Sequence, residues 1–145
     1  MPNPNVAQGT VNRALSSVIW TSFPALNVTA PYTAPEGLRM ALEGVSTLLI
    51  PTMTGLVPSP EPYMPFSLTI HLLMSQPLSD AYKTQMETNA TLGTGVARPV
   101  TTTLSPYQLN SAAIESINEL DWSGRSASYV IRVRGYYLTN AAMWG

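Results

Sequence analysis

The chain has 145 residues, a formal net charge of −1 and no cysteine. This length fits a single domain that buries about two-thirds of its unfolded surface. The basic residues form no cluster, which argues against sequence-specific nucleic-acid binding, and the lack of cysteine excludes disulfides and thiolate metal sites. Only 10% of the residues are charged, against about 25% in an average soluble domain. So few charges favour a surface covered by copies of the chain or by partners over a weakly charged secreted β-domain.

The N-terminal part is predicted to be a flexible arm followed by short β elements. Residues 1–12 are polar and rich in proline and asparagine, as is typical of a mobile terminus. They contain no signal-peptide pattern, and no apolar run approaches the roughly 18 residues of a membrane span, so we expect no membrane insertion. Alternating residues predict strands over 15–20 and 26–29, and prolines with a glycine predict a loop over 31–37.

Residues 37–74 are predicted to form one long β-hairpin. Apolar and polar residues alternate in 38–43 and again in 64–74, which predicts two half-buried strands. The second strand would span roughly 36 Å at about 3.3 Å per residue. The connector over 51–63 is rich in proline and almost uncharged, yet it carries large apolar side chains, namely Met53, Leu56, Val57 and Tyr63. We expect these side chains to contact a molecule outside their own subunit.

One amphipathic helix is predicted over 77–90. Ser75 can cap it, and Pro77 lies in the first turn, where proline is tolerated. Lys83 and Glu87 have the spacing of an ion pair on its outer face. The inner face is predicted to be a stripe of Leu78, Ala81, Tyr82, Gln85 and Met86.

The rest of the chain is predicted to be β. A strand over 96–103 contains Pro99, which predicts an edge position. A strand over 107–120 alternates imperfectly and predicts a bulge, and a turn at 121–124 leads to the last strand over 127–138.

Together these elements predict one mainly β domain over 1–145. The fold would be an antiparallel β-sandwich or partly closed barrel, with one flanking helix and a long protruding hairpin. The tail over 139–145 carries Met143 and Trp144, which a solvated tail would not need, so both are candidates for docking on a neighbour.

No catalytic site is predicted, and neither a metal nor another cofactor is expected. His71 is the only histidine, so no histidine-based metal site can form. The sequence lacks a phosphate-binding loop, a dinucleotide-binding pattern and a nucleophile elbow. Glu115, Glu119 and Asp121 could be imagined as an acid/base group, but charges beside a hairpin turn are typical of its solvated end.

Several polar side chains alternate with apolar ones along the predicted strands. If these strands are neighbours, the polar residues form one hydrated surface. That surface is either an ordinary solvated face or the wall of a wide channel built from several subunits. The residues are Arg39, Glu43, Ser67, Thr69, His71, Arg132 and Arg134.

Several segments also carry a family resemblance. They are LNVTAPY (26–32), PTMTG (51–55) with SPEPY (59–63), TIHLL (69–73) followed by AYKTQME (81–87), and the closing strand over 127–138. On these segments, from about residue 8 to the C-terminus, the chain resembles the tail tube proteins of contractile-tailed bacteriophages. That family is related to the tube protein of type VI secretion.

The resemblance implies a virion structural protein of the phage tail, assembled in the bacterial host cytoplasm. Six subunits would form a ring whose inner sheets join around a lumen, and the rings would stack into a tube. DNA would pass through the lumen without specific binding during genome ejection. The tail sheath and the baseplate or terminator proteins would be partners. The connector over 51–63 would contact the adjacent ring, and the polar strand faces would line the lumen.

The resemblance leaves three points open. The family's lumen is often acidic, whereas the polar faces here carry arginine as well as glutamate, so the sign of the lumen charge stays open. A tube subunit of a contractile secretion or pyocin-like machine is the first alternative function. A small-ligand-binding β-barrel is the second.

Overall fold

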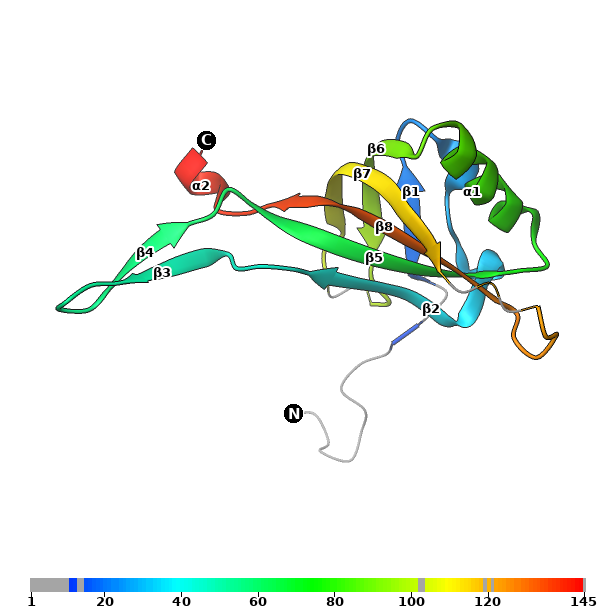
Figure 1. The fold of residues 1–145 in the computed structure, drawn as a ribbon, viewed down its shortest axis with the longest axis horizontal. Helices are drawn as coiled ribbons and strands as arrows, with labels where there is room; N and C mark the ends of the chain where they lie inside the picture. The colour runs from blue at the N-terminus through cyan, green and yellow to red at the C-terminus, as the bar shows by residue number, and fades with distance from the viewer. Residues whose placement is uncertain (1–10, 13–14, 102–103, 119, 121, 145) are drawn as a thin grey trace, which may run out of the picture.

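The computed structural model describes residues 11–12, 15–101, 104–118, 120 and 122–144, and it is mainly β (Figure 1). The largest sheet is antiparallel and curls into a half-barrel, with the strand order β1-β6-β7-β8-β5-β2. Its strands are β1 (Ser17–Trp20), β6 (Thr91–Arg98), β7 (Tyr107–Asn118), β8 (Ser128–Leu138), β5 (Tyr63–Leu73) and β2 (Thr33–Leu42). The predicted fold class, a partly closed antiparallel barrel with one flanking helix, is confirmed.

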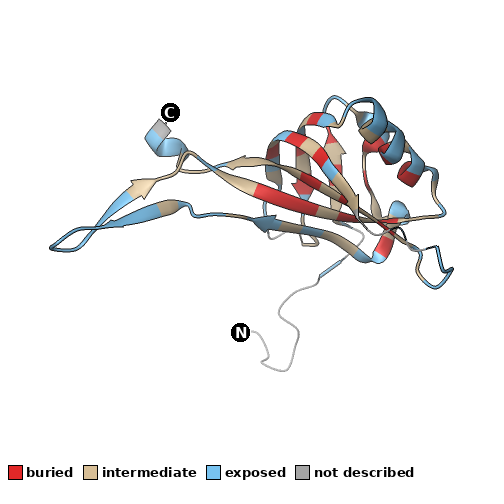
Figure 2. Cartoon of the chain, viewed as in Figure 1, coloured by how far each residue is buried: buried red, intermediate tan, exposed pale blue. Residues whose placement is uncertain are grey.

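The hydrophobic core lies against one face of this sheet. Alternation along β5 buries Phe66, Leu68, Ile70 and Leu72, and alternation along β8 buries Tyr129, Ile131 and Val133. Figure 2 shows the buried residues gathered in the body of the molecule, away from the protruding hairpin.

The flanking helix α1 (Pro77–Thr88) closes one end of the core. Leu78 and Tyr82 are buried as predicted, whereas Gln85 turns outward and its amide donates to the carbonyl of Asn89. The predicted cap is wrong: the N-cap residue is Gln76 and no side chain caps the helix. Lys83 and Glu87 form the predicted ion pair at 3.1 Å.

A buried hydrogen-bond chain ties α1 to the start of the domain. The indole Nε1 of Trp20 donates to the hydroxyl of Tyr82 over 2.9 Å. That hydroxyl donates in turn to the carbonyl of Leu26 over 2.6 Å. Leu26 ends η2 (Pro24–Leu26), so two consecutive elements, β1 and η2, meet the distant helix α1 at one phenol. Burial raises the pKa of Tyr82 above its usual value.

Two predictions for the N-terminal part, a strand over 26–29 and a loop over 31–37, are wrong. Residues 26–29 form no strand and contribute only an isolated bridge between Val28 and Val18. The predicted loop over 31–37 is instead η3 (Ala30–Tyr32) followed by the start of β2. An irregularity in the pairing of β2, with Gly37 at φ +70°, lets the strand continue where glycine suggested a loop.

β6 also differs from its prediction. It ends at Arg98, before Pro99, and lies between β1 and β7 rather than at an edge. Gly93 also lies inside this strand, at φ +79°. At Gly95 a side chain would meet the Trp20 ring at 2.5 Å, so glycine is needed for this close approach.

The bulge predicted in β7 is present. Its pairing with β8 shifts register twice, and Ser111 has φ +48°. The predicted turn over 121–124 includes Asp121, which lies outside the described residues, as does Glu119. The described part of that turn contains Gly124 at φ +82°.

The predicted connector over 51–63 is mostly strand. β3 (Thr47–Pro51) and β4 (Leu56–Pro60) pair as a second, separate hairpin that extends the ribbon of β2 and β5 (Figure 1). Glu61 donates its backbone N–H across the ribbon to Ser46. The alternate positions Pro60 and Pro58 therefore face the outer edge of β4, where no partner strand needs an N–H. The single predicted hairpin is therefore two hairpins in series.

None of the helices in the described part of the chain is long and apolar enough to cross a membrane.

Candidate functional site

The protruding hairpin, defined here as residues 44–60, is apolar and has no charged residue. Its large side chains are exposed by 44% to 104% of their area. They are Val45, Leu48, Leu49, Ile50, Met53, Leu56 and Val57. Because successive strand residues point to opposite faces, Leu48 and Leu49 make both faces of the ribbon apolar.

In the described part of the chain, no third strand pairs with this ribbon. An isolated two-stranded hairpin is marginal in water, and β3 and β4 pair only with each other. Contiguous exposed apolar surface of this kind is typical of an interaction site. The tip is held by Thr52, whose backbone N–H and hydroxyl both donate to the carbonyl of Gly55 at 2.7 and 2.9 Å.

The structure brings only part of the predicted contact loop together. Met53, Leu56 and Val57 lie at or beside the tip of the protruding hairpin. Tyr63 lies at the start of β5 instead, where its ring meets Tyr136 edge-on at 5.6 Å between centroids. Sequence reasoning missed a run of exposed apolar residues in β3, although the letters LLI were a visible signal.

The C-terminal segment holds the base of the protruding hairpin. The side-chain amide of Asn140 donates to the carbonyls of Ser46 and Glu61, at 2.8 and 2.7 Å. Thr139 donates its hydroxyl to the same Glu61 carbonyl at 2.7 Å. Asn140 has φ +53°, a conformation that asparagine tolerates better than most residues. One side chain thus bridges the chain just before β3 and just after β4.

The predicted docking residues of the tail follow this bridge directly. They lie in α2 (Ala141–Trp144), beside the hairpin base in Figure 1. Met143 is 66% exposed, and the side chain of Trp144 lies outside the described part of the chain. Docking of the tail on a neighbour stays a prediction.

The predicted polar residues do share one face of the sheet. β2, β5 and β8 are neighbours, and Arg39 pairs with Thr69, which pairs with Arg132. One step along, Ser67 pairs with Arg134. His71 continues the same face of β5, and Glu43 follows the end of β2. This surface, opposite the core, is called the polar face below.

An ion-pair network occupies the middle of the polar face. Glu43 lies 2.5 Å from Arg134 and 3.6 Å from Arg132. Glu115 of β7 lies 3.4 Å from Arg132 and 3.7 Å from Arg134. Each carboxylate therefore contacts both guanidinium groups. Arg132 also donates from Nε to the hydroxyl of Ser67 at 3.1 Å.

Sequence reasoning assigned Glu115 to the solvated end of a hairpin and missed its place in this network. The register shift between Ile114 and Ser116 carries Glu115 to the side of the two arginines. Glu36 was also missed: it accepts a hydrogen bond from Ser128 at 3.4 Å, and the same hydroxyl contacts Nδ1 of His71 at 3.4 Å. Only the strand order shows that these residues share the polar face.

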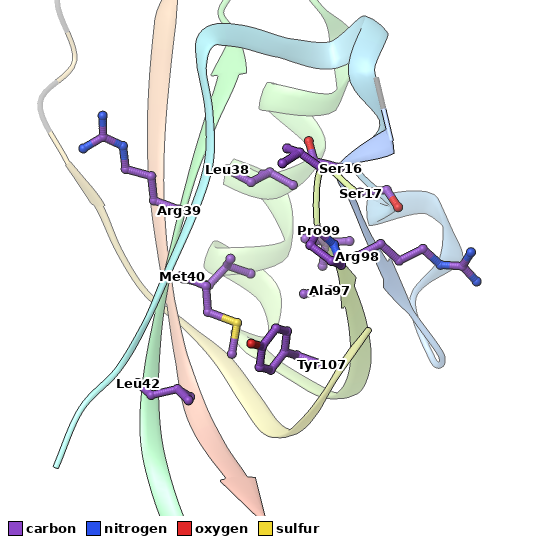
Figure 3. A pocket seen from close by; sticks show the side chains of 13 residues that line it. Ser16, Ser17, Leu38, Arg39, Met40, Leu42, Ala97, Arg98, Pro99 and Tyr107 are labelled. Atoms are coloured by element: carbon purple, nitrogen blue, oxygen red, sulfur yellow. The ribbon is translucent and has the colours of Figure 1, made fainter. Parts of the chain in front are cut away.

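An open cleft of about 480 Å³ lies where the half-barrel fails to close. Its lining comes from β2 on one side and from β1, β6 and the start of β7 on the other (Figure 3). Met40 and Tyr107 point toward each other across it, whereas Arg39 points away. Among the described residues, no group of three side chains could hold a metal ion.

The comparisons with known proteins add no relative. Neither the models of known protein families nor the curated protein sequences match this chain. What the chain does is therefore inferred from its residues and from their geometry.

Proposed function

We propose that this chain is the structural subunit of a phage tail tube, in which rings of six copies stack around a channel for DNA. The observation that carries the proposal is the protruding hairpin, which is uncharged and apolar on both faces. The ring size and the phage context come from the sequence resemblance. The geometry supports the more general part, assembly of many copies.

The protruding hairpin fits a contact between rings. Burying its apolar surface on another copy would contribute about 25 cal/mol per Å². A hairpin that docks on a different surface of the next copy makes a heterologous contact, which propagates as a filament unless rotation closes it. Repetition around a ring would turn a weak contact into a strong one.

The end of the sheet fits a contact within a ring. β2 is an end strand, and no backbone hydrogen bond joins its outer edge to another described element. Exposed edges invite pairing with another chain. Continuing the sheet from one copy to the next would remove that edge, as closure does in a barrel.

The polar face fits the lumen in this arrangement. A sheet with one core face and one wet face can form the wall of a water-filled channel. The strands that carry the polar face are β2, β5, β8 and the second half of β7. If the free edge of β2 paired with the next copy, these strands would become part of one sheet that runs from copy to copy.

The same geometry supports a tube in a secretion or pyocin-like machine. Neighbouring genes for a capsid or terminase would separate a phage tail from such a machine.

The cleft at the open seam favours a second candidate, a small-ligand-binding barrel, because its volume lies in the range of small-molecule sites. A ligand-binding barrel would function as a monomer.

Negative-stain electron microscopy of the purified chain, with sedimentation velocity over a range of concentrations, tests the proposal. Rings or tubes with a central channel are the expected result. A monomer at every concentration would contradict the proposal and favour the ligand-binding alternative.

A further inference from the structure

The charges of the polar face balance. Its carboxylates are Glu36, Glu43 and Glu115, and its guanidinium groups are Arg39, Arg132 and Arg134, so the face carries three negative and three positive charges. For Arg132 and Arg134 the balance is also local, because each contacts both Glu43 and Glu115.

We propose that Glu43 and Glu115 mask Arg132 and Arg134, so that the polar face does not hold the phosphate backbone of a nucleic acid. Without these carboxylates, strands β2 and β8, which flank β5, would present Arg39, Arg132 and Arg134 as a basic patch. Arginine binds phosphate with the same paired N–H groups that it offers a carboxylate. Two carboxylates beside each guanidinium offset its positive charge locally and so weaken its attraction for phosphate.

The masking has little to do with the stability of the fold. The four side chains are 37% to 43% exposed, and exposed ion pairs contribute about 0–1 kcal/mol to stability. The core lies on the opposite face of the sheet. The network therefore fits a role in what the surface binds better than a role in folding.

Arg39 differs from the other two arginines of the polar face. It contacts no carboxylate in the described part of the chain, and its guanidinium points away from the cleft (Figure 3). A phosphate backbone on the polar face would meet this one uncompensated arginine per copy. Each phosphate contact changes the slope of log K against log salt by about −0.9, so weak and salt-sensitive binding is expected of the unchanged face.

The proposal rests on the proposed function, because it assigns the polar face to contact with passing DNA. Its test does not require tubes. Binding of a short double-stranded DNA is measured by fluorescence anisotropy, with every variant carrying Leu49→Glu to keep copies apart. Glu43→Gln with Glu115→Gln removes both masking charges and keeps the side-chain shape.

We expect this double variant to bind the DNA at least tenfold more tightly at low salt, with a slope steeper by about 2 because of the two released arginines. Adding Arg132→Gln and Arg134→Gln should return binding to the starting value. Glu61→Gln with Glu87→Gln makes the same change in net charge away from the polar face, and it should leave binding nearly unchanged.

Three outcomes would overturn the masking proposal: no gain in the double variant, an equal gain in the Glu61/Glu87 control, or a gain that persists without Arg132 and Arg134. Circular dichroism checks that each variant is folded. If the double variant is not folded, Glu115→Gln alone should give a smaller gain, and its absence would overturn the proposal. If DNA binding rises in the double variant while the chain with Leu49 intact never forms tubes, the result would support masking and contradict the tube.

Discussion

The body of the sheet and the protruding hairpin are built from the same kinds of residue but have opposite surroundings. In the body, Ile70 and Val133 are fully buried against the core. In the hairpin, Ile50 and Val57 pair across two strands and are 44% and 51% exposed. Apolar side chains on one face of the body pack into the core, whereas those of the hairpin have no core to pack against. Apolar side chains thus stabilise the subunit in one region, and in the other they are available to a partner.

The largest expected effect separates the two regions directly. Ile70→Ala should lower the free energy of unfolding by about 2–5 kcal/mol, because it opens a cavity in the core. Ile50→Ala should change it by about 0.5 kcal/mol or less, because the site is exposed. Urea denaturation of the unassembled subunit measures both. Equal effects would mean that the hairpin packs within its own subunit.

A charge on the protruding hairpin tests the other half of the comparison. Leu49→Glu should abolish tube formation, since a buried carboxylate without a partner strongly disfavours an apolar contact, and it should leave the melting temperature unchanged. Thr84→Glu is the matched control, because it places the same charge on the exposed face of α1. Electron microscopy counts the tubes, and normal tubes from Leu49→Glu would rule out the hairpin contact.

The buried phenol gives the body a pH dependence that the hairpin lacks. Tyr82→Phe leaves the indole N–H of Trp20 without its acceptor, which should cost about 1–3 kcal/mol. Because burial raises the pKa of Tyr82, ionisation is disfavoured in the folded state. Stability should therefore be complete below about pH 10, the unfolded pKa, and fall above it.

Thermal denaturation between pH 8 and about pH 11 measures this alkaline loss. The loss should be smaller in Tyr82→Phe than in the unchanged chain. Tyr129, whose pKa burial also raises, keeps part of it. An identical profile in both proteins would show that Tyr82 is not the group responsible.

The smallest expected effect lies at the junction of the two regions. Asn140→Gly keeps the backbone conformation at φ +53° but removes both hydrogen bonds to the hairpin base. Net hydrogen-bond contributions suggest a loss of about 1 kcal/mol or less at this partly exposed site. Tubes should be fewer or shorter, because the hairpin would be less well oriented. Asn140→Asp, which keeps the size but not the donor, should behave like glycine in the tube count.

The sequence by itself determined the elements whose pattern is local. Alternation along β8 puts Tyr129, Ile131, Val133 and Tyr137 on one face, and the first three of these are buried. The helical spacing of Leu78 and Tyr82 predicted the inner face of α1. The period of the side chains follows from backbone geometry alone. The partly closed barrel and the polar face of β5 and β8 followed from the same reasoning.

The tertiary structure decided what depends on contacts between distant segments. The predicted strand over 96–103 begins after Gly95, yet this glycine lies inside a central strand, where the Trp20 ring needs the space. The prolines of β4 indicated a loop, but a two-stranded ribbon has a free edge that accepts them. Glu115 joined the arginine network only because a bulge changed the side to which it points. The places of Gly95, the β4 prolines and Glu115 depend on strand register and strand order. The local pattern of apolar and polar residues determines neither of these.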